Sequence, residues 1–177
     1  GDIDNDGDMD VVYTEMNSWG RGTSFWCLMN DGTGYLKKRK CGGADAFGLE
    51  LADMDGDGIV DLVISLPSVN QVVVLLNGGN DPVTGDWLGF SNGSISTTVG
   101  LTPTGLALGN VDGDSAIDIV VACTDDDEVW VLENQVANSG NFIGTAYAVN
   151  GHIPPELLPL KAEPVDVAIG NFVDGGG

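Results

Sequence analysis

The sequence predicts an all-β fold of repeated antiparallel units, and three observations support this. Glycine accounts for 27 of the 177 residues, roughly twice its usual share, which indicates many tight turns and short strands. Apolar residues alternate with polar ones or form short β-branched runs, as strands require. An acidic nine-residue pattern recurs three times with similar flanking segments. Although the net charge is -21, 42% of the residues are hydrophobic, so a core can form.

The acidic pattern reads D-x-D-x-D-G-x-x-D. Its first copy covers residues 2–10 and its second covers residues 53–61. A third copy, at residues 110–118, has Asn110 at the first position and Ser115 in place of the glycine. Because the copies are similarly spaced and similarly flanked, the sequence predicts a repeat protein rather than isolated acidic turns.

Strands are predicted on both sides of the acidic loops. Alternating segments precede the second and third loops, with Phe47, Leu49 and Leu51, and with Thr104, Leu106 and Leu108, at matching offsets. A β-branched run follows each loop, at residues 11–13, 62–64 and 119–121. A second apolar run then ends in Asn30, Asn77 or Asn134, and an aromatic step at Tyr35, Phe90 or Phe142 is expected to open a further strand. Each unit therefore offers about four short strands, the content of one propeller blade.

These units divide the chain into an incomplete propeller of three blades plus the start of a fourth. We expect repeats at residues 1–44, 45–102 and 103–162, and a truncated fourth at residues 163–177. The first starts in its acidic loop. The fourth has an apolar alternation before Asn171, but Val173 stands where the pattern requires aspartate, so no fourth metal loop is predicted. Propellers close with about 4–8 blades, so we expect the chain to be part of a longer protein or to be completed by another copy or a partner.

The spacing of the acidic loops predicts about three calcium ions. Ca²⁺ takes about 6–8 oxygen ligands, which positions 1, 3, 5 and 9 and the carbonyl of position 7 would supply as the backbone curls. The predicted ligands are Asp2, Asp4, Asp6, Asp8 (carbonyl) and Asp10; Asp53, Asp55, Asp57, Ile59 (carbonyl) and Asp61; and Asn110, Asp112, Asp114, Ala116 (carbonyl) and Asp118. We expect the third loop to bind more weakly and calcium to be structural, because the closed ligand set leaves few positions for a substrate. An EF-hand is excluded, because it needs a glutamate at position 12 and flanking helices.

These loops and their flanking strands resemble the FG-GAP/VCBS repeat family, and Ala46-Phe47-Gly48 echoes the Phe-Gly step of that family. In that family such loops join consecutive strands of a β-propeller blade and bind calcium. The resemblance covers nearly the whole chain. It implies an extracellular or cell-surface setting, as in the heads of integrin α-subunits, but it implies no particular ligand.

The basic cluster at residues 37–40 and the three cysteines each allow two interpretations. The cluster is either an interaction patch for an acidic partner or glycan, or an exposed outer strand whose charges discourage edge pairing. Cys27 and Cys41 lie in one repeat and form a disulfide in an oxidising compartment, leaving Cys123 over. The alternative is three buried free thiols.

Four tryptophans and a glycosylation sequon complete the candidates. Trp26 and Trp130 occupy the same repeat position, which predicts core residues. Trp19 and Trp87 lie outside this register, in glycine-rich loops, and are the better candidates for ligand contact. Asn92 begins the only N-x-S/T sequon and offers a glycan site.

The sequence favours a binding module over an enzyme. The sole histidine, His152, lies in a proline-rich connection and no nucleophile motif accompanies it. The acidic balance excludes nucleic acid and disfavours an anionic membrane surface, and no apolar run is long enough to span a bilayer. The chain opens without a signal peptide, so we expect a removed leader or a fragment.

The leading hypothesis is a calcium-stiffened extracellular module for adhesion, protein–protein interaction, or surface or filament assembly. Its partners would be other proteins or further copies of the same assembly. The alternative is an accessory or lectin-like propeller of a secreted enzyme that acts on polysaccharide, in which a glycan is the ligand.

Overall fold

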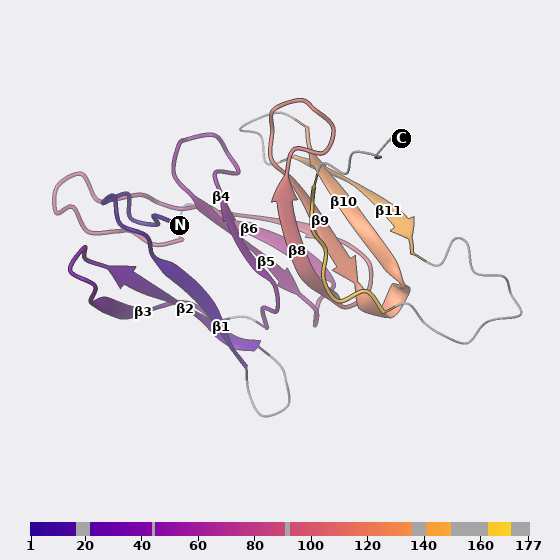
Figure 1. The fold of residues 1–177 in the computed structure, drawn as a ribbon, viewed down its shortest axis with the longest axis horizontal. Helices are drawn as coiled ribbons and strands as arrows, with labels where there is room; N and C mark the ends of the chain where they lie inside the picture. The colour runs from indigo at the N-terminus through magenta and orange to yellow at the C-terminus, as the bar shows by residue number, and fades with distance from the viewer. Residues whose placement is uncertain (17–21, 44, 91–92, 136–140, 150–162, 171–177) are drawn as a thin grey trace, which may run out of the picture.

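The computed structural model describes residues 1–16, 22–43, 45–90, 93–135, 141–149 and 163–170. In this part the chain is β-structure and loops, with one short 3-10 turn, η1 (Thr124–Asp126). Three antiparallel sheets lie side by side in chain order (Figure 1). Within the described residues, no helix is long and apolar enough to cross a membrane. The predicted all-β fold is confirmed.

Each sheet is a meander, in which strands that are consecutive in sequence pair with each other. Sheet 1 consists of β1 (Val11–Met16), β2 (Gly22–Asn30) and β3 (Leu36–Gly42). Sheet 2 consists of β4 (Leu49–Ala52), β5 (Asp61–Leu66), β6 (Gln71–Leu75) and β7 (Ser94–Thr98). Sheet 3 consists of β8 (Pro103–Gly109), β9 (Asp118–Cys123), β10 (Glu128–Asn134) and β11 (Phe142–Ala148). Sheets 2 and 3 have the four predicted strands. Sheet 1 has three.

Both faces of sheet 2 are covered, which explains why its strand β5 is apolar without interruption. Val63 belongs to the core between sheets 2 and 3. Its neighbours Leu62 and Ile64 pack with Phe25 of sheet 1 on the opposite face. A strand that is buried on both faces loses the polar alternation of a half-exposed strand. The same holds for β9, which is buried along its whole length.

Strands β4 and β8 pack next to each other, and glycine permits their close approach. The N–H of Gly48 donates to Ser65 Oγ at 2.8 Å, and that hydroxyl donates to the carbonyl oxygen of Thr104 at 2.6 Å. A Cβ at Gly48 would collide with the Thr104 carbonyl. Gly105 plays the same part toward the following segment, since a Cβ there would lie 2.6 Å from the Cα of Asp166. The Phe-Gly step is therefore a point where successive repeats meet backbone to backbone.

The basic cluster lies on β3, the exposed outer strand of sheet 1, as one of its two interpretations requires. Two of its basic side chains also make cation–π contacts with aromatic rings. Arg39 stacks 4.6 Å from the ring centre of Trp87, and Lys38 lies 4.0 Å from that of Trp26. Because side chains alternate along a strand, these two contacts are on opposite faces of the sheet.

Of the two interpretations of the cysteines, the disulfide is confirmed: Cys27 of β2 and Cys41 of β3 are bonded, with their Cα atoms 6.0 Å apart. Cys123 is a buried free thiol at the end of β9. The alternative of three free thiols is therefore wrong.

Two expectations about aromatic residues are wrong in part. Trp130 packs against the core between sheets 2 and 3, as predicted. Trp26, at the same repeat position, is half-buried like Trp130 but packs against none of the core clusters found among the described residues, and its indole N–H donates to Glu15 at 2.9 Å. Its face of sheet 1 points away from sheet 2, and no other sheet of the described chain covers it. The step at Phe90 does not open a strand directly, because β7 begins at Ser94. Phe90 instead packs edge-on against the ring of Trp87.

Some predicted features lie outside the described residues, and the structure says nothing about them. They are Trp19, the sequon residue Asn92, His152, Asn171 and Val173.

Candidate metal centres

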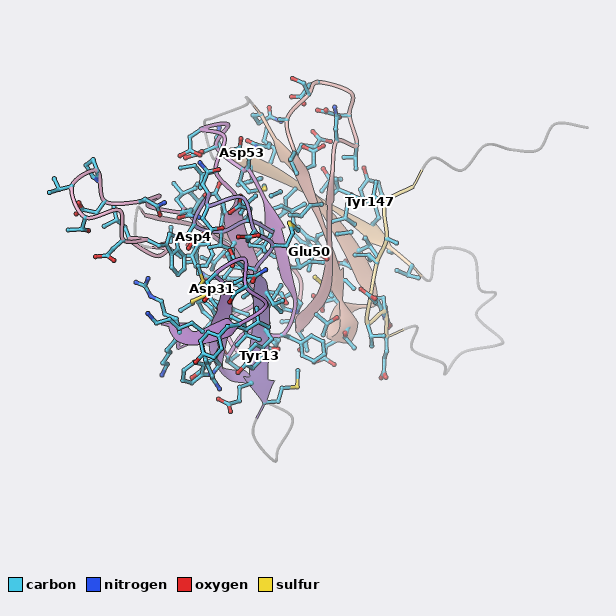
Figure 2. All side chains as sticks on the ribbon, turned by 60° about the vertical axis from the view of Figure 1, so that its left-hand side comes forward. Asp4, Tyr13, Asp31, Glu50, Asp53 and Tyr147 are labelled. Carbon is cyan, nitrogen blue, oxygen red and sulfur yellow. A yellow bond between two sulfur atoms is a disulfide. The ribbon has the colours of Figure 1, made fainter. Side chains whose placement is uncertain are left out.

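Two of the three acidic loops bring carboxylates together as the spacing predicts. In loop 1 (residues 2–10), oxygens of Asp2, Asp4 and Asp10 all lie within 4.8 Å of one another. In loop 2 (residues 53–61), Asp53, Asp55 and Asp61 form the same cluster. Asp4 and Asp53, labelled in Figure 2, mark these neighbouring loops. Positions 1, 3 and 9 therefore converge in both loops.

The first carboxylate of each loop winds the backbone around itself. Asp2 accepts the N–H groups of Asp6 at 3.1 Å and Gly7 at 3.0 Å. Asp53 accepts those of Gly56 at 2.6 Å and Gly58 at 2.9 Å. In loop 3 (residues 110–118), the amide oxygen of Asn110 accepts the N–H of Gly113 at 2.6 Å. The residue at position 1 therefore turns the backbone in all three loops.

The loops need positive φ at two positions, the fourth and the sixth. The fourth holds Asn5, Gly56 or Gly113, all of which have positive φ. The sixth holds Gly7, Gly58 or Ser115, with φ of 97°, 87° and 94°. Serine pays a steric cost for such a φ that glycine does not, so loop 3 is strained where its sequence departs from the pattern.

The carboxylates at position 5 do not join the clusters. Asp6 accepts the N–H of Asp8 at 2.9 Å, and Asp57 accepts that of Ile59 at 2.8 Å. Asp114 accepts the N–H of Ala116 at 2.7 Å in loop 3. These bonds turn the backbone at position 7, but no distance places the carbonyls of Asp8, Ile59 or Ala116, which remain predicted ligands.

The third loop folds like the others but gathers fewer carboxylates. Asp112 accepts the N–H of Asp114 at 3.0 Å, as Asp55 accepts that of Asp57 at 3.1 Å. Within the described chain, however, Asp112, Asp114 and Asp118 do not form a cluster of the kind found in loops 1 and 2. Since Asn110 replaces the first carboxylate, this agrees with the weaker binding expected for loop 3.

The carboxylate at position 9 closes each loop from a buried place at the start of a strand. One oxygen accepts the N–H of position 2: Ile3 at 2.8 Å for Asp10, Met54 at 2.9 Å for Asp61, and Val111 at 2.7 Å for Asp118. The other oxygen accepts the N–H of the asparagine that ends the second apolar run: Asn30 at 2.7 Å, Asn77 at 2.8 Å and Asn134 at 2.9 Å. In the sequence these asparagines stand out only as markers of the repeat, and their recurrence is the signal of this role.

The charge of loop 1 favours a cation. Burial, followed by the charges of Asp6, Asp10 and Asp2, raises the pKa of Asp4 above its usual value. Asp4 Oδ1 is buried and has no hydrogen-bond donor in the described structure. A buried carboxylate oxygen without a donor, beside two further carboxylates, fits a hard divalent cation. In loop 2, burial raises the pKa of Asp61, although N–H donors from Asn77 and Met54 act in the opposite direction.

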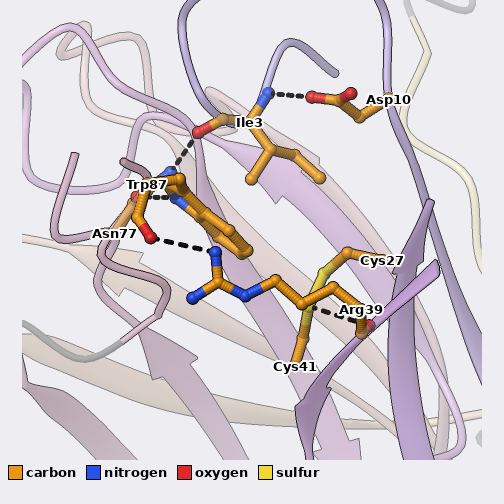
Figure 3. Close-up of a disulfide and its surroundings, with 7 residues drawn as sticks. All are labelled: Ile3, Asp10, Cys27, Arg39, Cys41, Asn77 and Trp87. Atoms are coloured by element: carbon orange, nitrogen blue, oxygen red, sulfur yellow. Dashed lines mark hydrogen bonds between the residues drawn. A yellow bond between two sulfur atoms is a disulfide. The ribbon is translucent and has the colours of Figure 1, made fainter. Parts of the chain in front are cut away.

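Trp87 is buried rather than exposed in a loop. It is 6% exposed and packs with Ile3 and the disulfide. Its indole N–H donates to Asn77 Oδ1 at 2.8 Å, and its carbonyl accepts the Arg39 guanidinium at 2.9 Å (Figure 3). Trp87 is therefore a packing residue between repeats, outside the strand register because it belongs to the connection between β6 and β7.

The fold and the loops together define a class of protein: an array of blade-like antiparallel sheets, each joined to a nine-residue acidic loop. Residues 2–64 match the family model of the FG-GAP-like repeat. The predicted resemblance is confirmed for this segment, and the same loop-and-sheet pattern continues through sheet 3. Comparison with curated proteins and with solved structures gives no significant match.

Proposed function

We propose that the chain is a calcium-binding interaction module of the cell surface or extracellular space, in which calcium has a structural role. The observation that carries the proposal is the pair of carboxylate clusters, each built from positions 1, 3 and 9 of its loop. The donors are hard oxygens, which suit Ca²⁺ better than metals that prefer thiolate or imidazole. The ion would link the start of a loop to the strand that follows it, and so stiffen each sheet.

Two further observations support the setting and the role. The Cys27–Cys41 disulfide is typical of proteins that mature in an oxidising compartment. The match of residues 2–64 to the FG-GAP-like repeat favours a propeller-type module for protein interaction. We propose that the chain binds another protein or further copies of the assembly, and that it does not catalyse a reaction.

Chelation followed by thermal unfolding tests the metal. Adding calcium to chelator-treated protein at about 100 times Kd should raise Tm by roughly 5 °C or more, because the folded state alone holds the clusters. The variants Asp4→Asn and Asp55→Asn should each lower the gain. Asp86→Asn is the matched control, since Asp86 is an exposed carboxylate outside the three loops. An unchanged Tm in the unmodified protein would refute the proposal.

A second candidate is glycan binding, and one groove favours it. A cavity of about 410 Å³ lies beside loop 1 and is lined by residues that include Asp4, Asn30, Tyr35 and Lys37. Tyr35 is 67% exposed, and an exposed aromatic ring beside polar groups is a common sugar platform. Binding on a glycan array that is lost in Tyr35→Ala but kept in Tyr147→Ala would support a lectin. Tyr147 is 54% exposed on β11 and serves as the control.

A further inference from the structure

A chain of hydrogen bonds connects each acidic loop to the next one, through Asn77, which follows β6, and Asn134, which ends β10. Asn77 begins it. Its backbone N–H donates to Asp61 Oδ1 of loop 2 at 2.8 Å, while its side-chain Nδ2 donates to the carbonyl of Ile3 in loop 1 at 2.8 Å. Ile3 donates its own N–H to Asp10, the position-9 carboxylate of loop 1 (Figure 3). Asn77 thus bonds a ligand of loop 2 directly and is linked to a ligand of loop 1 through Ile3.

The next repeat makes the same connection. The N–H of Asn134 donates to Asp118 Oδ1 at 2.9 Å, and its Nδ2 donates to the carbonyl of Met54 at 3.2 Å. Met54 donates its N–H to Asp61 at 2.9 Å. The three position-9 carboxylates are therefore joined in series, and we call this series the inter-loop chain.

Asn77 is fixed in place by four partners. Its Nδ2 also donates to Val60 at 2.9 Å, and its Oδ1 accepts Gly79 N–H at 3.0 Å and Trp87 Nε1–H at 2.8 Å. The side chain is 2% exposed, so no water competes for these bonds. A buried amide with every donor and acceptor in use cannot rotate without breaking several bonds. A displacement of Asp61 is therefore passed to Ile3 rather than absorbed by the side chain.

Resting on the proposed calcium sites, we propose that Asn77 and Asn134 are positioning residues that make metal binding at adjacent loops cooperative. Calcium at loop 2 fixes Asp61, Asp61 fixes Asn77, and Asn77 holds the carbonyl of Ile3, the residue whose N–H donates to Asp10. Loop 1 is then already partly ordered when its own ion binds. Less conformational entropy is lost on binding, so the calcium affinity of loop 1 is higher.

The backbone amides of the three asparagines give a separate readout for each loop. The N–H of Asn30 reports on Asp10 in loop 1, that of Asn77 on loop 2, and that of Asn134 on loop 3. A calcium titration of the whole chain, followed by ¹⁵N–¹H correlation spectra, gives a midpoint for each amide. Asp55→Asn disables loop 2 and keeps an amide oxygen to accept the N–H of Asp57.

A double-mutant cycle tests the coupling. With Asn77 intact, Asp55→Asn should raise the calcium midpoint of the Asn30 amide by about fivefold or more, the usual lower range of allosteric coupling. In an Asn77→Ala background, which keeps the backbone N–H, Asp55→Asn should leave that midpoint unchanged. If Asn77 only stabilised the fold, Asn77→Ala would shift every midpoint and the Tm, but Asp55→Asn would still raise the Asn30 midpoint by the same factor.

Asn30→Ala is the matched control. Asn30 occupies the same repeat position, but its Nδ2 donates at 3.3 Å to Met9 within its own loop. The fivefold effect of Asp55→Asn should survive this change. If Asn77→Ala does not fold, Asn134→Ala replaces it, with Asp112→Asn to disable loop 3 and the Asn77 amide as readout.

The possible failures are distinct. If calcium moves the three amides with midpoints that do not depend on the neighbouring loop, the inter-loop coupling is refuted while the metal sites stand. If Asn77→Ala leaves the coupling intact, the route through this residue is refuted. If calcium moves none of the amides, the proposed function fails and the coupling fails with it.

Discussion

At the scale of single residues, the backbone of loop 3 is the clearest departure from the repeat. Ser115 has a φ of 94°, where loops 1 and 2 have glycine. Ser115→Gly should therefore stabilise the protein by about 1 kcal/mol and raise Tm by roughly 2–4 °C in thermal unfolding. Ser96→Gly is the control, because Ser96 is an exposed residue of β7 where glycine should weaken the strand. Equal effects of the two changes would contradict the assignment of strain to Ser115.

The close approach at the Phe-Gly step gives a second prediction. Gly48→Ala should destabilise the protein by about 1–3 kcal/mol, because the added methyl group would collide with the Thr104 carbonyl and approach Ser65 Oγ to 3.0 Å. The measurement is the free energy of unfolding in urea. Gly43→Ala should change it by less than about 0.5 kcal/mol, since its Cβ would meet only the flexible end of Lys40 at 3.9 Å. A loss for Gly43→Ala as large as that for Gly48→Ala would argue against the packing described.

The raised carboxylate pKa values predict a pH dependence that metal reverses. Burial raises the pKa of Asp4, Asp61 and Glu50, so the folded apoprotein binds these protons more tightly than the unfolded chain does. The stability they contribute is present below their unfolded pKa and is lost as pH rises through the raised folded values. The Tm of chelator-treated protein should therefore rise as the pH is lowered from about 7 to about 4.5. With saturating calcium it should fall over the same range, because protons compete for the ligands.

Glu50 separates the two contributions. It lies outside the loops, and burial followed by the charge of Asp166 raises its pKa. Glu50→Gln should change the slope of the apoprotein and the slope with calcium by the same amount, because Glu50 is not a proposed ligand, so the difference between the two slopes should remain. Identical slopes with and without calcium would show that protons and metal do not share ligands.

At the scale of elements, the disulfide ties β2 to β3 at the outer edge of the array. Cys123 is buried in β9, and burial raises the pKa of its thiol to about 12. A thiol reagent should therefore find no reactive cysteine in the folded protein, one after unfolding without reductant, and all three after reduction. Reducing the Cys27–Cys41 bond should cost about 3 kcal/mol of stability, the value expected for a loop of this length. Two or more thiols reactive before reduction would refute the pairing.

Sequence predicted the elements well because the repeat is local. The strands around loops 2 and 3 follow from runs such as residues 62–64 and 119–121, and the convergence of Asp53, Asp55 and Asp61 follows from their spacing. The bonds from Asn77 to Ile3 and from Asn134 to Met54 could not be predicted, because they join residues 74 and 80 apart.

The aromatic residues show the other limit of sequence reasoning. Trp87 lies in a connection, where no strand register indicates its burial, so its packing between repeats could not be predicted. Trp26 shares the repeat position of Trp130, but whether that position is core depends on a neighbouring sheet.

At the scale of the whole molecule, the three sheets form an open array with two unlike end faces. The face of sheet 1 that points away from sheet 2 carries Trp26 and Val11, the latter 46% exposed. The equivalent faces of sheets 2 and 3 are each covered by the preceding sheet. A blade of the same type, from another copy or a partner, would fit this face of sheet 1. Light scattering should show mass increasing with concentration, and Val11→Glu should suppress the increase. A constant monomer mass in both proteins would argue against association between copies.

Calorimetric titration of the metal-free protein with calcium tests the central claim most directly. The claim is that the acidic loops are metal sites, of which loops 1 and 2 are complete and loop 3 is weaker. The titration should therefore show two tighter sites and one weaker site, with Asp4→Asn and Asp55→Asn each weakening one of the tighter pair. No heat of binding, or a heat that both variants leave unchanged, would contradict it.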